Sequence, residues 1–375
     1  MDCLGARIRI SDEGRVEVID PGFADLPLLQ EIDPSFRVRR SPLPNFSTPR
    51  FLKTRNLPMG VTRQELTSWP EKSLWTLHRL GVDLLHKSST VYSLENDEAS
   101  LLDVKIEIGY RLLKNCILCG HRCGVDRTIG ERGRCLLGEE AVAVKYYVHI
   151  AEEASINPSL LVYLAGCGLR CRYCQQGDLQ NPEMVVGEPI EEGLWDRLPL
   201  KGARSLSFIG GNPDESLPAI LRFLSTAPDS WSLPIVWNCH GYGSLEAVAL
   251  LAGVVDAYLP DIKYGDPDCG LNLSAAPNYP SLAYQALEAM LTHGVPVLVR
   301  HLVLPGHYMC CQAPLLNFLS IHRENPFLQL SIRDQYCPDW LITDNDGLLT
   351  RRVSPSEVKR VCREAQELGL SLVEA

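Results

Sequence analysis

The second half of this chain repeats one pattern: a short apolar run, then a turn, then in most cases a stretch with helical spacing. The six apolar runs cover residues 160–165, 205–209, 234–237, 257–259, 295–299 and 328–332, and helical spacing appears at 218–225, 244–252, 281–292 and 313–322. Runs of this length are typical of buried strands. Successive strand–helix units form a parallel sheet covered by helices. We therefore expect an α/β fold, a partial (βα)6 TIM-like barrel.

Three further regions surround the predicted barrel, which spans residues 146–340. Residues 1–110 form an N-terminal extension that is rich in proline to about residue 58 and then helical, with a second helix near 99–113. Trp69 and Trp75 are expected in the core of this helical lobe. Residues 111–145 form a cysteine-rich metal-binding segment, and residues 341–375 form a C-terminal helical tail.

Polar or glycine-rich segments follow the predicted strands. They cover residues 167–174, 210–213, 238–241, 261–263, 300–301 with 305–306, and 333–336. Parallel barrels carry their chemistry at the carboxyl ends of the strands. These segments are therefore expected to meet at one end of the barrel and to form its functional site.

Cys167, Cys171 and Cys174 form a C-x3-C-x2-C array after the first predicted strand. A four-iron cluster that only transfers electrons is held by four thiolates. Three thiolates leave one iron with an open position, and for this spacing we expect S-adenosylmethionine (SAM) to bind there. A zinc loop is the alternative, but zinc sites usually recruit four ligands in paired C-x2-C units, and no fourth ligand follows here.

A second array, Cys116, Cys119, Cys123 and Cys135, precedes the barrel with C-x2-C-x3-C-x11-C spacing. Four thiolates on glycine-rich loops predict a closed site, and both zinc and an auxiliary iron–sulfur cluster suit it. His121 lies inside the array and could replace a thiolate, although a hydrogen bond to a ligand sulfur or plain exposure to solvent fits it better. A structural zinc would tie the helical lobe to the barrel, whereas an auxiliary cluster could relay electrons or bind substrate.

The remaining cysteines lack ligand spacing: Cys3, Cys239, Cys269, Cys310, Cys311, Cys337 and Cys362. Cys362 is expected in a terminal helix as a buried packing residue. Cys239 and Cys337 fall at predicted strand ends that should face the active site. Both are candidates to donate a hydrogen atom to a substrate radical, with pocket lining as the alternative.

The composition argues against several classes of protein. A formal net charge of −10 disfavours a nucleic-acid partner, because such proteins concentrate Lys and Arg on one face. The short basic run at 37–40 reads as a solvated loop. No apolar run reaches membrane-spanning length, and the first residues lack the layout of a signal peptide, so we expect no membrane partner and a cytoplasmic protein. Half of the fourteen cysteines lie in the two arrays, which favours metal binding over disulfides.

The cysteine loop, the Gly-Gly-Asn-Pro at 210–213 and the Asp-Ile-Lys at 261–263 together resemble the radical SAM superfamily. Within it, the chain is similar to an uncharacterised branch related to pyruvate formate-lyase activating enzyme. That similarity rests on the upstream cysteines, the Arg-His-Leu-Val-Leu-Pro-Gly at 300–306 and the Gln-Tyr-Cys-Pro at 335–338. The resemblance covers about residues 111–340.

This resemblance implies a function for each matched position. The three thiolates would hold a [4Fe-4S] cluster whose open iron binds the amino and carboxylate groups of SAM, and cleavage of SAM would yield a 5'-deoxyadenosyl radical. Tyr173 would pack against the adenine. Gly210 and Gly211 would present backbone carbonyls to the methionyl ammonium, while Lys263 and Arg300 would contact the carboxylate, each with a structural ion pair as the alternative. A low-potential flavodoxin or ferredoxin would supply the electron.

The chain departs from the family pattern at two positions. Asn238 stands where the activating enzymes often carry Asp, which puts a cation site with Asp261 in doubt. Asn212 stands where Glu is usual in the Gly-Gly-x-Pro motif, and Asp214 could compensate for the lost carboxylate.

Three functions fit the sequence. The first is a radical SAM enzyme that abstracts hydrogen from an unknown substrate, either a small molecule or a peptide. The second is an activase that installs a glycyl radical in a partner protein, and the third is a non-catalytic iron–sulfur or zinc module. The third leaves the glycines, Lys263 and Arg300 unexplained. The long extension slightly favours the first, because extra domains often reshape the barrel mouth.

Overall fold

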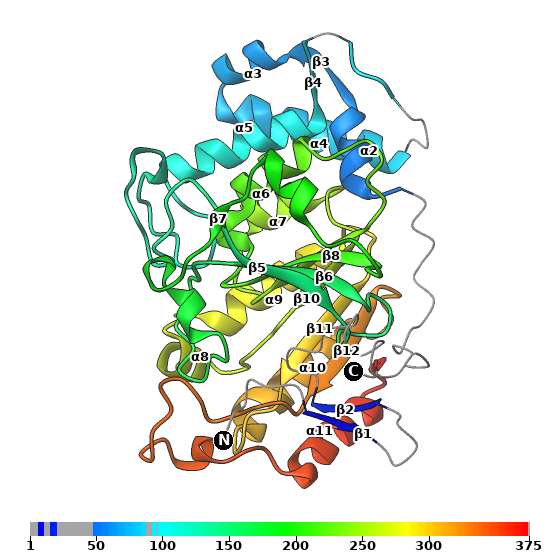
Figure 1. The fold of residues 1–375 in the computed structure, drawn as a ribbon. Coiled ribbons are helices and arrows are strands. Elements are labelled where there is room, and N and C mark those ends of the chain that lie inside the picture. Colours follow the sequence, from blue (N-terminus) through cyan, green and yellow to red (C-terminus); the bar gives the residue numbers. More distant parts are fainter. Residues whose placement is uncertain (1–6, 11–15, 21–47, 88–91, 96, 374–375) are drawn as a thin grey trace.

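An eight-stranded sheet forms the centre of the computed structural model, which describes residues 7–10, 16–20, 48–87, 92–95 and 97–373 (Figure 1). The strand order is β12-β11-β10-β9-β8-β6-β5-β7. Six consecutive strands are parallel: β6 (Ser159–Leu164), β8 (Ser205–Gly210), β9 (Ile235–Cys239), β10 (Ala257–Pro260), β11 (Val297–Leu302) and β12 (Leu328–Arg333). Each overlaps one predicted apolar run, so the predicted α/β partial barrel is confirmed.

Helices connect these strands and cover the outer face of the sheet (Figure 1). They are α6 (Leu217–Ser225), α7 (Leu245–Leu251), α8 (Pro267–Ser274), α9 (Tyr279–Leu291) and α10 (Ala313–Ile321), followed by the C-terminal α11 (Pro355–Glu367). Shorter turns are η1 (Arg127–Ile129), η2 (Gly177–Gln180), η3 (Pro182–Met184), η4 (Glu192–Arg197), η5 (Asp214–Ser216), the π-helix η6 (Tyr308–Gln312) and η7 (Gly347–Thr350). Among the described residues, none of the helices has the length and apolarity needed to cross a membrane.

The two faces of the sheet have different surroundings because strand side chains alternate. Val162, Phe208 and Trp237 belong to the large core beneath the helices. On the opposite, inner face, Val236, Leu259 and Leu298 pack with Ile156, and Leu161 and Tyr163 pack with Leu179. The inner face therefore has only small apolar clusters, and polar side chains occupy much of the rest.

Two antiparallel strands at one side of the sheet were not expected from the sequence. They are β5 (Val142–His149), which pairs with β6, and β7 (Glu188–Pro189), which pairs with β5. Much of β5 is only half-buried and lacks a clear alternation of buried and exposed residues. This explains why a period-2 pattern does not stand out there.

The described part of the N-terminal extension is mainly a helical lobe on the outer surface. It contains β1 (Arg7–Ile10), β2 (Val16–Asp20), α2 (Arg50–Asn56), β3 (Pro58–Thr62), α3 (Arg63–Ser68), α4 (Glu71–Lys87), β4 (Glu98–Ser100) and α5 (Leu101–Lys114). Ser100 and Asp103 form a capping box that starts α5. Helix α5 packs against α6 and α7. Trp69 and Trp75, predicted as core residues of this lobe, are half-buried and pack against the edge of the main core.

Some sequence expectations fall outside the described residues. These are the proline-rich stretch between residues 21 and 47, the basic run at 37–40 and Cys3.

Candidate metal and cofactor site

The loop after β6 carries the three predicted cluster ligands. Cys167 and Cys171 are buried, Cys174 is half-buried, and all three are free thiols. Two of the loop's backbone N–H groups, those of Arg170 and Arg172, donate to carbonyls at the end of α8, at 2.8 and 2.9 Å. Three soft sulfur donors on one short, fixed loop suit an iron–sulfur cluster, so the donor chemistry fits the expected group.

Gly210 and Gly211 let the loop after β8 lie against the cysteine loop. A Cβ at Gly210, whose φ is +105°, would lie 2.5 Å from the backbone nitrogen of Leu164. One at Gly211 would lie 2.1 Å from the carbonyl oxygen of Gly166. Both positions require glycine because backbones approach closely there. The approaching backbone is that of β6 and its loop.

Glu215 connects these two loops to the loop after β9, and the sequence analysis missed it. Its carboxylate accepts from the backbone N–H of Gly168 at 2.9 Å and from the Asn212 amide at 2.5 Å, and it contacts His240 Nε2 at 3.1 Å. Burial raises the pKa of Glu215, but His240 and the hydrogen bonds outweigh this and lower the pKa to about 2. Glu215, in the sequence Asn-Pro-Asp-Glu, supplies a carboxylate that Asn212 lacks; only Asp214 was considered from the sequence.

We expect Glu215→Gln to lower the free energy of unfolding by about 1.5–3 kcal/mol, because it removes the charge from a buried, hydrogen-bonded carboxylate. The change should also shift the spectrum of the reduced cluster, since Gly168 follows Cys167. Chemical denaturation and low-temperature EPR check the two effects. The exposed Glu192→Gln is the matched control. Equal results for the two variants would contradict this role of Glu215.

Lys263 lies beside the cysteine loop. Its ammonium pairs with Asp261, and its charge acts on the thiols of Cys171 and Cys174. Burial lowers the pKa of Lys263, but Asp261 and Cys171 raise it overall, so the side chain stays protonated. A fixed positive charge is therefore held near the predicted cluster.

Tyr173 begins a chain of hydroxyl groups that ends on a cysteine. Its hydroxyl lies 2.7 Å from that of Tyr264, which lies 2.5 Å from the Ser274 hydroxyl. Ser274 in turn donates to the Cys171 sulfur at 2.9 Å. Tyr336 contacts the Tyr173 ring edge-on at 5.7 Å. Tyr173, within the cysteine loop, thus has its ring packed against Tyr336 and its hydroxyl linked to Cys171 through Tyr264 and Ser274.

The upstream cysteines lie directly against the same loop. Cys116, Cys119 and Cys135 are buried, and Cys123 is half-buried. His121 Nε2 lies 2.9 Å from the carbonyl oxygen of Gly168. Arg127 donates to the Cys116 sulfur at 3.8 Å. Among the described residues, no three of these sulfurs gather within 4.8 Å of one another.

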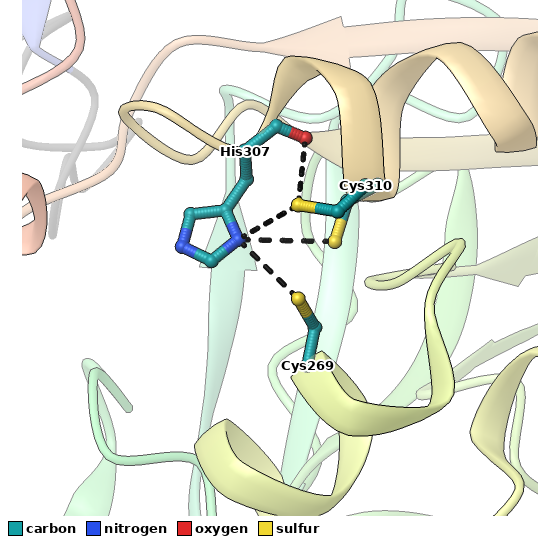
Figure 2. Close-up of side chains that lie close together, drawn as sticks. Cys269, His307 and Cys310 are labelled. Carbon is teal, nitrogen blue, oxygen red and sulfur yellow. Dashed lines mark hydrogen bonds between the residues drawn. The ribbon is translucent and has the colours of Figure 1, made fainter.

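Three cysteines without ligand spacing do meet in space. Cys269, Cys310 and Cys311 surround His307, and the four ligand atoms all lie within 4.8 Å of one another (Figure 2). The sequence did not predict this group, because Cys269 is distant from the others along the chain. In addition, Cys310 and Cys311 are adjacent, and no common ligand spacing includes adjacent cysteines.

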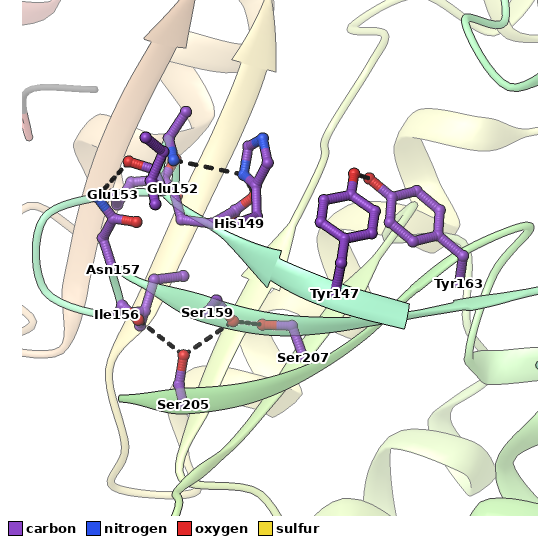
Figure 3. Close-up of polar contacts among 12 residues, drawn as sticks. Tyr147, His149, Glu152, Glu153, Ile156, Asn157, Ser159, Tyr163, Ser205 and Ser207 are labelled. Atoms are coloured by element: carbon purple, nitrogen blue, oxygen red, sulfur yellow. Dashed lines mark hydrogen bonds and ion pairs between the residues drawn. The ribbon is translucent and has the colours of Figure 1, made fainter. Parts of the chain in front are cut away.

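Arg300 lies on the inner face and contacts two glutamates. Its Nε donates to Glu153 at 2.8 Å, and its terminal nitrogen contacts both Glu152 and Glu153. Figure 3 shows both glutamates in the loop after β5. Arg333 also donates to Glu153, at 2.8 Å. The structure therefore shows the ion-pair alternative for Arg300, and its contact with SAM remains a prediction.

The two candidate hydrogen donors are placed differently from the prediction. Cys239 belongs to the outer core, because alternation along β9 directs Val236 and Asn238 inward and Cys239 toward the helices. Hydrogen donation by Cys239 remains a prediction. Cys337 is buried and disulfide-bonded, so in this state it has no S–H hydrogen to donate.

Comparisons with known proteins agree with this fold and site. A family model described as the radical SAM superfamily matches residues 161–319. An uncharacterised protein of Methanocaldococcus jannaschii is 30% identical over 309 residues, covering 80% of this chain and 89% of that protein. The chain belongs to the radical SAM superfamily. It is therefore an enzyme that uses a [4Fe-4S] cluster and SAM.

Solved structures show weaker likeness. Streptococcus suis SuiB bound to its precursor peptide SuiA has a TM-score of 0.44 at 14% identity, covering 80% of this chain and 61% of SuiB. HydG, a maturase of the [FeFe]-hydrogenase, has a TM-score of 0.41 at 14% identity, covering 83% of this chain and 64% of HydG. This chain thus spans less than two thirds of either solved chain.

Proposed function

We propose that this enzyme cleaves SAM at a cluster held by Cys167, Cys171 and Cys174 and then abstracts a hydrogen atom from a substrate bound on the inner face of the sheet. The observation that carries the proposal is the meeting of three segments at one end of the parallel strands. The cysteine loop lies against Gly210 and Gly211, and Lys263 acts on two of its thiols. The cluster and SAM together supply a 5'-deoxyadenosyl radical.

Unpaired polar atoms support a ligand site beside this meeting point. Asn238 Nδ2, Asp261 Oδ1 and Ser331 Oγ are buried and have no hydrogen-bond partner within the described structure. In the register of the sheet, Asp261 lies opposite Arg300, and Arg300 lies opposite Ser331. These three residues therefore form one row across the inner face. Buried polar atoms are rarely left unpaired. A bound polar molecule would satisfy them.

The inner face also offers contacts to a substrate farther from the cysteines. The hydroxyls of Tyr147 and Tyr163 lie 3.0 Å apart, and their rings stack. Figure 3 shows the two hydroxyls pointing toward each other. The Lys145 ammonium lies 4.5 Å from the centre of the Tyr163 ring and donates to Gln176 beyond the cysteine loop, at 2.7 Å. Below them, Ser159, Ser205 and Ser207 hydrogen-bond to one another. This lining favours a polar substrate.

Other residues of the chain would position SAM and exclude water. Lys263 would bind its carboxylate, with Asp261 holding the ammonium in place. The segment after β12 covers the outside of the cysteine loop. In it, the backbone N–H of Leu341 donates to the Arg172 carbonyl at 2.8 Å, and Asp346 pairs with the Arg172 guanidinium at 2.6 Å.

We expect Lys263→Ala to weaken SAM binding by roughly 10- to 150-fold, because a charge-assisted hydrogen bond is worth about 1.5–3 kcal/mol. Anaerobic equilibrium dialysis with labelled SAM measures the change. The exposed Lys201→Ala serves as the control. If both variants bind SAM as tightly as the unchanged protein, Lys263 has no such role.

The position of the helical lobe bears on the activase alternative. The helical part of the extension packs on α6 and α7, outside the barrel, whereas Figure 1 shows β1 and β2 at the opposite end of the molecule. The barrel mouth is bordered instead by the cysteine-rich segment. There the backbone N–H of Gly120 donates to the Tyr242 carbonyl at 2.8 Å, and the backbone N–H of Ser244 donates to the Leu118 carbonyl at 3.0 Å. The lobe therefore gives no preference between a small molecule, a peptide and a partner glycyl-radical enzyme.

The upstream cysteines are proposed to hold an auxiliary iron–sulfur cluster. Thiolates that share one zinc ion lie about 3.8 Å apart, given Zn–S bonds of about 2.3 Å. The wider separation of these sulfurs suits a cluster, whose thiolates bind different irons. His121, which lies between these cysteines in the sequence, contacts the Gly168 carbonyl of the cysteine loop. This proximity suits electron transfer from a flavodoxin or ferredoxin through the auxiliary cluster toward the SAM-binding cluster.

A further inference from the structure

Cys269, His307, Cys310 and Cys311, here called the Cys3His group, lie apart from both predicted cluster sites. His307 Nδ1 is 3.5 Å from the Cys269 sulfur, 3.4 Å from the Cys310 sulfur and 3.9 Å from the Cys311 sulfur. In Figure 2 dashed lines join this one nitrogen to three sulfurs, which all lie on the same side of the imidazole ring. All three cysteines are free thiols, and Cys311 is fully buried.

These distances match a tetrahedral metal site. A zinc ion with Zn–S bonds of about 2.3 Å and a Zn–N bond of about 2.0–2.1 Å holds each sulfur about 3.5 Å from the nitrogen. Three thiolates and one imidazole are a common ligand set of structural zinc. An iron–sulfur cluster fits less well, because its ligands bind separate irons and lie farther apart.

The backbone explains how adjacent cysteines reach one ion. His307 caps the π-helix η6, and Cys310 and Cys311 follow it three and four residues later. The backbone N–H of Cys311 donates to the His307 carbonyl at 2.8 Å, so this turn brings the two cysteines back to His307. Single-turn π-helices are frequent at functional sites. Gly265 allows the loop before α8 to approach this turn, since a Cβ there would lie 2.7 Å from the Cys311 carbonyl oxygen. Asp266 caps α8 by accepting from the backbone N–H of Cys269 at 2.9 Å.

We propose that the Cys3His group binds a structural zinc ion that fixes α8 to the turn after β11. Helix α8 carries Cys269 in its first turn and Ser274 at its end. Ser274 donates to the Cys171 sulfur, and its carbonyl accepts from the Arg170 N–H at 2.8 Å. The zinc therefore holds the element that supports the cysteine loop of the SAM site.

The test compares anaerobically purified full-length chains by elemental analysis. Cys310→Ser with Cys311→Ser should lose about one zinc per chain relative to the unchanged protein, while the iron content stays the same. Cys362→Ser is the matched control, because this half-buried thiol lies on α11 outside the group. The double variant should also show a lower melting temperature, and its SAM-site cluster should show a changed EPR signal through Ser274.

A second measurement covers the case in which the double variant fails to fold. Zinc-edge X-ray absorption of the unchanged protein should show sulfur ligands at about 2.3 Å and a nitrogen ligand at about 2.0–2.1 Å. Absence of zinc from the unchanged protein, or a zinc content that the double variant retains in full, would overturn the proposal. Loss of iron in place of zinc would overturn it as well. Each of these outcomes is distinct from failure of SAM cleavage, which tests the proposed function.

Discussion

Protein in which Cys167, Cys171 and Cys174 are all replaced by alanine is expected to produce no 5'-deoxyadenosine above the enzyme-free background. The reason is that these three thiols, two of them buried and Cys174 half-buried, lie on the loop that Glu215, Lys263 and α8 surround, and they are the proposed ligands of the SAM-binding cluster. The change should also remove about four irons per chain, since each such cluster contains four.

The matched control for this variant is Cys362→Ala, which removes a thiol on α11 and should leave cleavage unchanged. SAM cleavage that persists in the triple variant would contradict the assignment. Iron that remains in the triple variant without cleavage would locate the auxiliary cluster at the upstream cysteines.

Replacing Glu153 by alanine is expected to lower the free energy of unfolding by about 3–5 kcal/mol, because it leaves buried charges without their partner. Glu153 is 1% exposed and contacts both Arg300 and Arg333. Denaturant unfolding measures the loss. The control is Glu183→Ala, which breaks an exposed pair with Arg132 and should cost about 0–1 kcal/mol. Similar losses in the two variants would show that the buried pairs contribute little.

The stability of the protein should also fall in acid because of Glu153 and its neighbour Glu152. Burial raises the pKa of Glu152 and of Glu153, but Arg300 outweighs this and lowers both below the ordinary value. Their contribution to stability is therefore present above about pH 4.3, the pKa of an unfolded glutamate, and is lost as the pH falls below it. When the pH is lowered from about 5 to about 3, the unfolding midpoint of Glu153→Gln should therefore fall less steeply than that of the unchanged protein. An unchanged slope would contradict this.

The sequence predicted most of the barrel because its parallel strands are buried on both faces. β6, for example, is buried throughout, and so it reads as an unbroken apolar run. Strand β5 was missed because it is half-exposed, and α8 was missed because its eight residues include a glycine, an asparagine and a serine. The structure brings Lys263 to the cysteine loop, since carboxyl ends of parallel strands meet at one edge of the sheet.

The rest of the site depends on contacts between distant segments. The partners of Arg300 lie in the loop after β5, nearly 150 residues earlier in the chain. The direction of Cys239 could not be predicted, because the direction of a strand-end residue depends on the register, and one residue reverses the face. The Cys3His group requires the turn after β11 to meet α8, which no local spacing encodes.

The most direct test of the account is an anaerobic assay of the reconstituted protein with SAM and a strong reductant, read out as 5'-deoxyadenosine and methionine. The account predicts that both products form in equal amounts and that neither forms without the reductant. A reduced protein that binds SAM and retains its cluster, yet forms neither product, would contradict the assignment of radical chemistry to this site.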